Sequence, residues 1–219
     1  RHSGYGKHLL IMAEGFISAN YDEVILGGSG LLQGVPCDND EESSVPFFEK
    51  RGYSADFISV NMGLELNDKA VEKLKEIPRP NGVTYRFADD NDREKLLAAV
   101  KDAQAEWLPV FEENSDAPVL LAVCGDEIAG FEMVEEYGGM FFSDNEKHSM
   151  IGCVGVTHKY RRRGIGLAMT AEGSLSLYEK NCKDIQLLYV ERVAWYNKLG
   201  YEVTSRQWMG RKKIQDIMF

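Results

Sequence analysis

The sequence has no run of about 18 or more apolar residues, the length with which an apolar helix spans a bilayer. Of its 219 residues, 44% are hydrophobic and 27% are charged, a balance typical of a globular chain in water. We therefore expect no membrane partner. The length allows one large domain or two modest ones.

Cysteine is scarce and scattered along the chain. The four cysteines include no C-x-x-C pair, and no histidine stands near them at zinc-finger spacing; they are Cys37, Cys124, Cys153 and Cys182. This pattern favours reduced structural thiols over a metal site or a disulfide framework. The beginning of the sequence also lacks a signal-peptide pattern. We expect a cytoplasmic protein without a metal.

Basic residues are outnumbered. Asp and Glu total 35 against 25 for Lys and Arg, so the formal net charge is -10 at pH 7. Such a balance argues against nucleic acid as a partner, because binding to phosphate backbones needs a basic face. The local exception comprises Lys159 and Arg161 to Arg163. A run of this kind is typical of a solvated turn, and that interpretation stays open at this point.

From Val83 onward, apolar periodicity predicts alternating strands and helices. The expected order is a strand (83–88), one long amphipathic helix (89–114), a hairpin (118–139) turning at Gly125-Asp126, a strand (148–160), a helix (164–180), a strand (184–190), a short helix (192–200) and a strand (201–210). Gly152 and Gly155 lie inside one strand, which indicates a bulge or a place where a ligand approaches the backbone.

The basic turn Arg161 to Gly166 reads R-R-R-G-I-G between that strand and the helix. Free N–H groups and the positive end of the dipole lie at a helix start, and glycines let an anion approach the backbone. The spacing excludes a Walker loop, and a dinucleotide-binding fingerprint does not fit. The pattern therefore predicts an anion cradle to which arginines add charge.

With these residues the second part of the chain resembles a GNAT superfamily N-acetyltransferase. Four segments match in the family's order: "VTYRFADDND", "LLAVCGDEIAGFEMV", "VGVTHKYRRRGIG" and "WYNKLGYEV", which together span about Val83 to Met209. The resemblance implies an α+β fold with a mixed, mostly antiparallel, splayed sheet flanked by helices. It also implies acetyl-CoA as co-substrate and transfer of the acetyl group to a primary amine of a small molecule.

The resemblance assigns the cofactor-binding residues. Backbone groups around Val154 and Val156 would hold the pantetheine arm, and backbone N–H groups of Arg162, Arg163, Gly164, Ile165 and Gly166 would hold the pyrophosphate. Arg161 occupies the first position of the motif. In the family an asparagine and an alanine commonly stand where this chain has Tyr189 and Arg192, so one cofactor contact is expected to differ.

Two catalytic residues are candidates. Tyr196 occupies the position that often gives a proton to the departing thiolate, although a core aromatic is the plain alternative. Glu132, on the hairpin strand beside the acceptor side, is the candidate general base, although a carboxylate on a strand is usually its solvated face. His158 stands where the family often has proline and is interpreted as a turn residue.

The start of the chain repeats the same order of features. "RHSGYG", a helix, "DEVILGG", "FFEKRGY" and a strand follow one another, with Phe48 at the place of Tyr196. Gly6 and Gly52 are 46 positions apart against 34 for Gly166 and Gly200, so the first copy holds 12 more residues, which the acidic loop 28–44 can absorb.

We therefore expect a partial GNAT-like repeat lacking its first strands (1–66), a helix and linker (67–82) in which Asn67 is the candidate helix cap, and a complete domain (83–219). The incomplete sheet would need cover, so a homodimer is one expected outcome. Three other functions stay open: acetylation of protein or peptide amines, a non-catalytic acyl-CoA-binding module, and an interaction domain whose glycine turn binds nothing.

Overall fold

The computed structural model describes residues 4–28, 33–39, 43–139 and 145–213. By compactness the chain divides into unit 1, residues 1–61 and 204–219, and unit 2, residues 62–203. Two long strands, β3 (Ser54–Glu65) and β9 (Glu202–Lys213), each begin in one unit and end in the other. The predicted division at residues 66 and 82 stays a prediction.

Unit 2 is built on a mixed sheet. The strand order is β3-β8-β7-β6-β5-β4, in which only β7 and β8 are parallel. The remaining strands are β4 (Thr84–Phe87), β5 (Val119–Cys124), β6 (Glu127–Glu135), β7 (His148–Val156) and β8 (Asp184–Leu187). The predicted mixed, mostly antiparallel sheet is confirmed, as is the hairpin turn, where Gly125 takes a φ of 61°.

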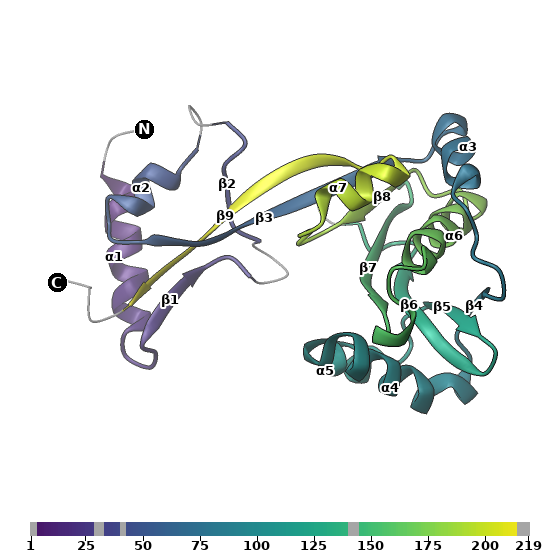
Figure 1. Cartoon of the computed structure of the whole chain (residues 1–219). Helices are drawn as coiled ribbons and strands as arrows, with labels where there is room; N and C mark the ends of the chain where they lie inside the picture. The colour runs from purple at the N-terminus through teal and green to yellow at the C-terminus, as the bar shows by residue number, and fades with distance from the viewer. Residues whose placement is uncertain (1–3, 29–32, 40–42, 140–144, 214–219) are drawn as a thin grey trace. The chain divides into compact units, whose positions relative to one another are not determined.

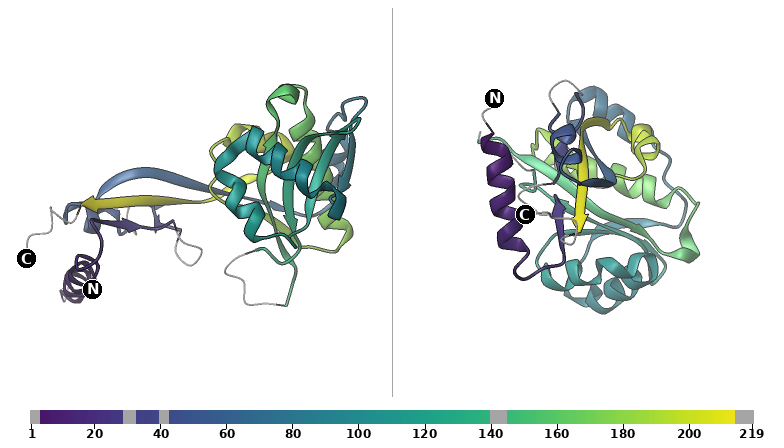
Figure 2. Two further views of the ribbon diagram at one scale, coloured as in Figure 1. Left: turned by 90° about the horizontal axis from the view of Figure 1, so that it is seen from below. Right: turned by 90° about the vertical axis from the view of Figure 1, so that its left-hand side faces the viewer.

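Helices cover both faces of this sheet (Figures 1 and 2). On one face lie α4 (Arg93–Gln104) and α5 (Leu108–Glu113). On the other lies α6 (Ile165–Glu179), accompanied by α3 (Asp68–Glu76); the short α7 (Val193–Tyr196) precedes β9. The Asn67 side chain caps α3 by accepting from the Ala70 N–H at 3.0 Å, as the sequence predicts.

The core under α4 explains where these helices lie. Leu96 and Val100 of α4 and Phe111 of α5 pack on Leu121 and Phe131 of the sheet, and all five are at most 4% exposed. The Phe111 and Phe131 rings meet edge to face with centroids 5.3 Å apart. Alternate residues of β6 therefore face α4, which turns the intervening residues toward α6.

The prediction of one long helix over 89–114 is wrong. The segment divides into the 3-10 turn η1 (Asp90–Asp92), α4, the 3-10 turn η2 (Ala105–Trp107) and α5. Pro109 lies at the second position of α5. Proline lacks the N–H that a continuous helix needs there and constrains the residue before it, so a new helix begins instead.

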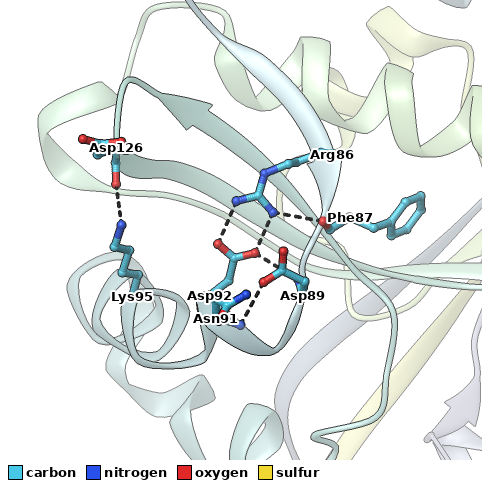
Figure 3. Close-up of polar contacts among 7 residues, drawn as sticks. All are labelled: Arg86, Phe87, Asp89, Asn91, Asp92, Lys95 and Asp126. Carbon is cyan, nitrogen blue, oxygen red and sulfur yellow. Dashed lines mark hydrogen bonds and ion pairs between the residues drawn. The ribbon is translucent and has the colours of Figure 1, made fainter.

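A charged cluster holds the entry to α4 (Figure 3). The Arg86 guanidinium on β4 donates to both carboxylate oxygens of Asp92 at 2.6 and 2.7 Å. Asp89 and Asp92 form a reciprocal capping box at the start of η1. The Arg86 bond lowers the pKa of Asp92 to about 2. Lys95 additionally donates to the Asp126 carbonyl, which ties the helix to the hairpin turn.

Unit 1 contains α1 (Tyr5–Ile17), β1 (Glu23–Leu26), β2 (Val35–Pro36), α2 (Val45–Glu49) and the adjoining parts of β3 and β9. Both β1 and β2 pair antiparallel with β9. Strand β2 lies inside the loop predicted for 28–44, of which 29–32 and 40–42 lie outside the described residues, as do Arg1 and the unassigned tail from residue 214. The core is formed by Val24, Val35, Tyr53 and Trp208.

A buried charge pair joins α1 to β9 in unit 1. Glu14 Oε1 accepts from the Lys212 ammonium at 3.1 Å and from the Tyr53 hydroxyl at 2.9 Å. All three residues are at most 7% exposed. The pair satisfies two charges that would otherwise be costly to bury.

Two segments of the chain share one order of elements. The first segment is α1-β1-α2-β3, with the two-residue strand β2 inserted after β1, and the second segment is α6-β8-α7-β9, with a 3-10 turn (Asn197–Leu199) after α7. Each begins after a left-handed glycine, Gly4 at φ 80° and ψ -11° and Gly164 at φ 78° and ψ -4°. Each has another such glycine before its last strand, Gly52 at φ 87° and Gly200 at φ 101°.

The aromatic contacts also recur. The rings of Phe48 and Tyr53 meet with centroids 5.7 Å apart, and those of Tyr196 and Tyr201 with centroids 5.9 Å apart. Tyr53 bonds to Glu14 on α1, and Tyr201 bonds to Ser174 on α6. The two segments therefore attach their helix to their last strand through the same tyrosine position.

Candidate functional site

Strands β7 and β8 separate in the middle of the sheet. Their parallel pairing covers only His148–Met150 against Asp184–Gln186, and β8 ends at Leu187. Strand β7 continues to Val156 and stays paired with β6 over that length. The side of β7 turned away from β6 is therefore without a paired strand, among the described residues, beyond Met150. A ligand with amide groups can bond to a strand edge of this kind.

Val156 points its main chain toward that open side. The neighbouring Thr157 N–H donates to the Ala129 carbonyl of β6 at 3.0 Å. Because main-chain groups alternate along an antiparallel strand, the Val156 N–H and C=O face away from β6. The Val156 carbonyl accepts from Arg161 Nε at 3.0 Å, and its N–H is directed to the open side. This placement suits the predicted pantetheine contact.

The glycines of β7 mark a bulge, as the sequence indicates. Phe131 pairs with Gly155 and Met133 with Gly152, so Cys153 and Val154 together oppose Glu132. Cys153 takes a φ of 50°, unusual for a residue with a side chain. A side chain at position 155 would collide with the Phe131 ring, so only glycine fits there. The bulge redirects the main chain of Val154 at the point where the strands separate.

The predicted cradle is the beginning of α6. Helix α6 starts at Ile165 after Gly164, whose φ of 78° favours glycine. A Cβ at Gly166 would lie 3.1 Å from the Val156 Cγ2 atom and 3.4 Å from the Trp195 ring, so this turn packs closely on β7 and α7. The free N–H groups of the first turn, Arg162 to Gly166, gather next to the open edge of β7.

Arg161 turns away from the cradle. Its Nη2 donates to the Ala103 carbonyl near the end of α4 at 2.9 Å, while its Nε holds Val156. Arg161 thus fixes the loop to β7 and α4 and leaves less of its guanidinium for a phosphate. Arg162 and Arg163 are exposed and form no ion pair within the described part of the chain. These two arginines are the better-placed source of positive charge.

Two carboxylates, Asp102 and Glu127, hold this loop through contacts that the sequence does not indicate. The Asp102 carboxylate on α4 accepts from the His158 N–H at 2.7 Å, so His158 is held at the start of the turn. The Lys159 ammonium reaches both oxygens of Glu127 at 2.7 Å, and the Tyr160 hydroxyl donates to Glu127 at 3.0 Å. No sequence motif could indicate them, since the partners stand more than 30 positions away in the chain.

Tyr196 lies at the end of α7, one residue after the Trp195 ring that faces Gly166. Its ring packs edge to face on Trp195 and on Tyr201, with centroids 4.6 and 5.9 Å away. Burial, and then the charge of Glu132, raise the pKa of Tyr196, while Arg192 opposes that rise. The Tyr196 hydroxyl makes no hydrogen bond among the described residues. Its ring is anchored and its hydroxyl is available.

Glu132 is brought to the same side of the sheet as Tyr196 but is fully buried, at 0% exposed. Its Oε2 accepts from the Thr170 hydroxyl of α6 at 2.7 Å. Desolvation raises its pKa to about 8, partly offset by the Thr170 bond. The sequence carried no clear signal for this contact, because α6 also contains the polar residues Glu172, Ser174, Ser176 and Glu179.

The departures from the family pattern have local consequences. Tyr189 takes a φ of 55° and is 43% exposed after the end of β8. Arg192 precedes α7 and its carbonyl accepts from the Trp195 and Tyr196 N–H groups at 2.9 and 3.3 Å. Helix α7 has four residues, continued by the 3-10 turn η4 (Asn197–Leu199), so the predicted short helix is confirmed.

No group of histidine, cysteine and carboxylate side chains in the described ranges could hold a metal ion. No described helix combines the length and apolar character needed to cross a membrane. In the described part of the chain, the four cysteines are not joined in disulfides.

A search by sequence finds no family model and no curated protein that matches this chain. Solved structures do match its fold. The GCN5-related glucosamine N-acetyltransferase region of a fungal multi-domain GH3 β-N-acetylglucosaminidase has a TM-score of 0.77 at 17% identity, over 97% of this chain and 28% of that chain. This chain therefore spans well under half of that enzyme.

Two further structures cover nearly the whole chain. A GCN5-related N-acetyltransferase from Sphaerobacter thermophilus has a TM-score of 0.72 at 23% identity, over 98% of this chain and 69% of that chain. A tandem GNAT protein from the clavulanic acid biosynthesis pathway has a TM-score of 0.65 at 15% identity, over 98% and 71%. At such identities the likeness concerns the fold: the chain has the GNAT fold.

Proposed function

We propose that the protein is an N-acetyltransferase that moves the acetyl group of acetyl-CoA to a primary amine of a small molecule. The observation that carries the proposal is the meeting of three features in unit 2. The open edge of β7 ends beside the first turn of α6, and the Tyr196 ring packs on the Trp195 ring that covers that turn.

These features match successive parts of the acetyl-CoA molecule. The main chain of Val154 and Val156 would bond the amide groups of the pantetheine arm, as a strand would. The N–H groups of Arg162 to Gly166 would hold the pyrophosphate, with Arg162 and Arg163 adding charge. Arg161 acts here by shaping the loop, because its guanidinium already holds two carbonyls.

The chemistry needed is direct attack of a neutral amine on the thioester carbonyl. Holding both reactants in line supplies much of the rate, and a hydroxyl at the sulfur assists its departure. Tyr196 is the proposed donor. The sequence makes Glu132 the candidate general base, but it is fully buried and has no cation beside it, so we leave the acceptor of the amine's proton unassigned.

Calorimetric titration of acetyl-CoA into the purified chain tests the first half of the proposal. We expect one site per chain, followed by release of CoA thiol when amines are added. Because one structural neighbour is described as a glucosamine N-acetyltransferase region, an amino sugar is a reasonable first acceptor, with a polyamine and a peptide amine beside it. The absence of binding heat would overturn the proposal. Binding of acetyl-CoA without acetyl transfer would favour a non-catalytic acyl-CoA-binding module.

A peptide or protein amine is the second candidate acceptor, and transfer to the peptide alone would favour it. We also propose a tandem protein in which residues 1–66 form a partial first repeat. The recurrence of glycine conformations and tyrosine contacts in the two segments supports this. Phe48 at the place of Tyr196 leaves that repeat without a proton donor, so its role would be structural or dimer-forming. Light scattering gives the mass that tests for the dimer.

Cysteines that are not joined in disulfides suit a reducing compartment, and we place the protein in the cytoplasm as part of the same proposal. Fractionation of cells that produce the full gene product tests this.

A further inference from the structure

One carboxyl group lies inside unit 2 without a cation beside it. Glu132 Oε2 accepts from Thr170, whereas Oε1 is buried and has no partner. Within the described residues Glu132 takes part in no ion pair. An ionised carboxylate in such a place is strongly disfavoured, because neither water nor a positive charge compensates it. A neutral carboxylic acid is tolerated better and has a proton to donate.

The fold leaves a place of defined shape for this group. Thr170 holds one oxygen, and a side chain at Gly173, one turn farther along α6, would collide with the other. Glycine at position 173 is therefore required by the Glu132 carboxyl. The orphaned Oε1 is confined between α6 and β6, where its partner must come from a neighbouring side chain or a bound water.

The titratable groups that face Glu132 are few. Tyr201, just before β9, contacts Ser174, one turn of α6 from Thr170, and the Tyr196 ring packs on Tyr201 with centroids 5.9 Å apart. The charge of Glu132 raises the pKa of both tyrosines. The Tyr201 hydroxyl is already bonded to Ser174 Oγ at 2.9 Å. From α6 only uncharged Thr170 and Gly173 reach it, and from β7 the bulge residue Cys153 lies opposite. Tyr196 is thus the facing group whose hydroxyl has no other partner.

The pKa of Tyr196 is too high for it to protonate the departing sulfur efficiently by itself. A thiol has an ordinary pKa of about 8.5 and a tyrosine of about 10, and the pKa of Tyr196 is raised further. Passing its proton to sulfur would leave a buried phenolate, which is unfavourable. Glu132, with a pKa of about 8, is close to the departing thiol in acidity.

We propose that Glu132 supplies, through Tyr196, the proton that the departing sulfur receives, which makes it a positioning residue for the tyrosine. The neutral amine forms the new nitrogen–carbon bond and releases one proton to solvent. As the carbon–sulfur bond breaks, its electron pair stays on sulfur. Sulfur takes the Tyr196 proton, and the tyrosine oxygen takes the Glu132 proton across one bound water, because the two groups are not in hydrogen-bond contact. The products are a thiol, a neutral tyrosine and a carboxylate, which regains a proton from solvent. The inference rests on the proposed acetyl transfer.

The inference requires the opposite protonation state from a general base. A base works when ionised, so its rate rises as pH rises through its pKa. A proton source works when protonated, so its rate falls over the same range. The rate kcat of the wild-type chain is therefore expected to fall as pH rises through about 8.

Kinetics of Glu132→Gln, Tyr196→Phe and the double variant test the relay. Each single variant is expected to lose about tenfold or more in kcat at neutral pH, with acetyl-CoA affinity retained, and Glu132→Gln is expected to lose the alkaline decline. The double variant should be no slower than the slower single one, because both act on one proton. If the kcat losses of the two single variants multiply in the double variant, the proposal is overturned. It is also overturned if Glu132→Gln removes a rise of kcat with pH instead of a fall.

Two measurements keep the test independent of folding and of activity. Thr170→Val removes a hydrogen bond that favours the ionised form of Glu132, so the decline of kcat should move to higher pH. Thr170→Ser keeps the hydroxyl, so the decline should stay at its wild-type pH. An infrared difference spectrum should show a protonated carboxyl band that disappears in Glu132→Gln and persists in Glu135→Gln, a carboxylate on the same strand. Absence of that band refutes the relay even if acetyl transfer stands. Absence of transfer with every amine, despite the band, refutes the proposed function and the relay with it.

Discussion

In both segments, α1 to β3 and α6 to β9, a tyrosine bonds to the segment's first helix, but the aromatic residue packed on that tyrosine differs. In each, a tyrosine after a left-handed glycine bonds to the helix, Tyr53 to Glu14 and Tyr201 to Ser174. Only the second segment has a hydroxyl on the preceding aromatic, Tyr196 against Phe48. The tyrosine that bonds to the helix is therefore a structural feature of this order of elements, and the proposed chemistry depends on the aromatic residue packed against it.

The segments differ as well in what covers their helix. In α6, Met169 is 0% exposed because it packs on Gly130 of β6. In α1 the residues at the same helical spacing are exposed: Tyr5 at 76%, Leu9 at 67%, Met12 at 71% and Phe16 at 80%. Similar helices thus contribute differently to stability, because burial depends on the strands beside them and not on the helix alone.

The largest stability effect is expected at the buried pair of unit 1. Lys212→Met leaves the Glu14 carboxylate buried with the Tyr53 hydroxyl alone, which should cost about 3–5 kcal/mol. Hydrogen exchange of the α1 amides measures it. Glu14→Gln combined with Lys212→Met removes both charges and should recover most of the loss; a double variant as unstable as the single one would contradict this account.

A matched pair of truncations tests the difference in burial. Met169→Ala should lower the free energy of unfolding by about 3 kcal/mol, since a buried methionine leaves a cavity. Leu9→Ala should change it by less than about 0.5 kcal/mol in the chain alone, because Leu9 is 67% exposed. Denaturant titration measures both. A large loss for Leu9→Ala would mean that α1 is covered in solution, and light scattering would then identify a dimer.

The chemical difference is tested by exchanging the two aromatics. Tyr196→Phe should reduce kcat about a hundredfold and leave the affinity for acetyl-CoA unchanged, because the ring contacts with Trp195 and Tyr201 persist. Phe48→Tyr, at the corresponding place, should restore no activity to that variant. An unchanged kcat for Tyr196→Phe would assign the proton to another donor.

The two glycine caps provide the smallest and most closely matched comparison. Gly4 and Gly164 have nearly the same left-handed φ, and a Cβ would meet nothing within 4 Å at Gly4 and only Pro80, at 3.8 Å, at Gly164, so valine strains both similarly. Gly164→Val should weaken acetyl-CoA binding about tenfold or more, since it displaces the first turn of α6. Gly4→Val should leave the affinity unchanged. Equal losses would mean that the first segment takes part in binding.

Local sequence patterns predicted much of unit 2. The Gly125 turn, the Asn67 cap, the bulge at Gly152 and Gly155 and the glycine start of α6 each depend on residues adjacent in the chain. Such features follow from backbone conformation and short-range hydrogen bonds, which one sequence can carry. The continuous helix across Pro109 was predicted wrongly because helical periodicity outweighed the local effect of that proline.

The sequence by itself determined the order of helices and strands, the glycine conformations and the basic turn before α6. The tertiary structure alone decided that β7 and β8 separate after Met150, that Arg161 turns to Ala103, and that Glu132 is buried against Thr170. A periodic pattern says that a strand has two faces but not which helix covers each. Burial and pKa are set by partners far away in the chain, and those partners meet only when the sheet is assembled.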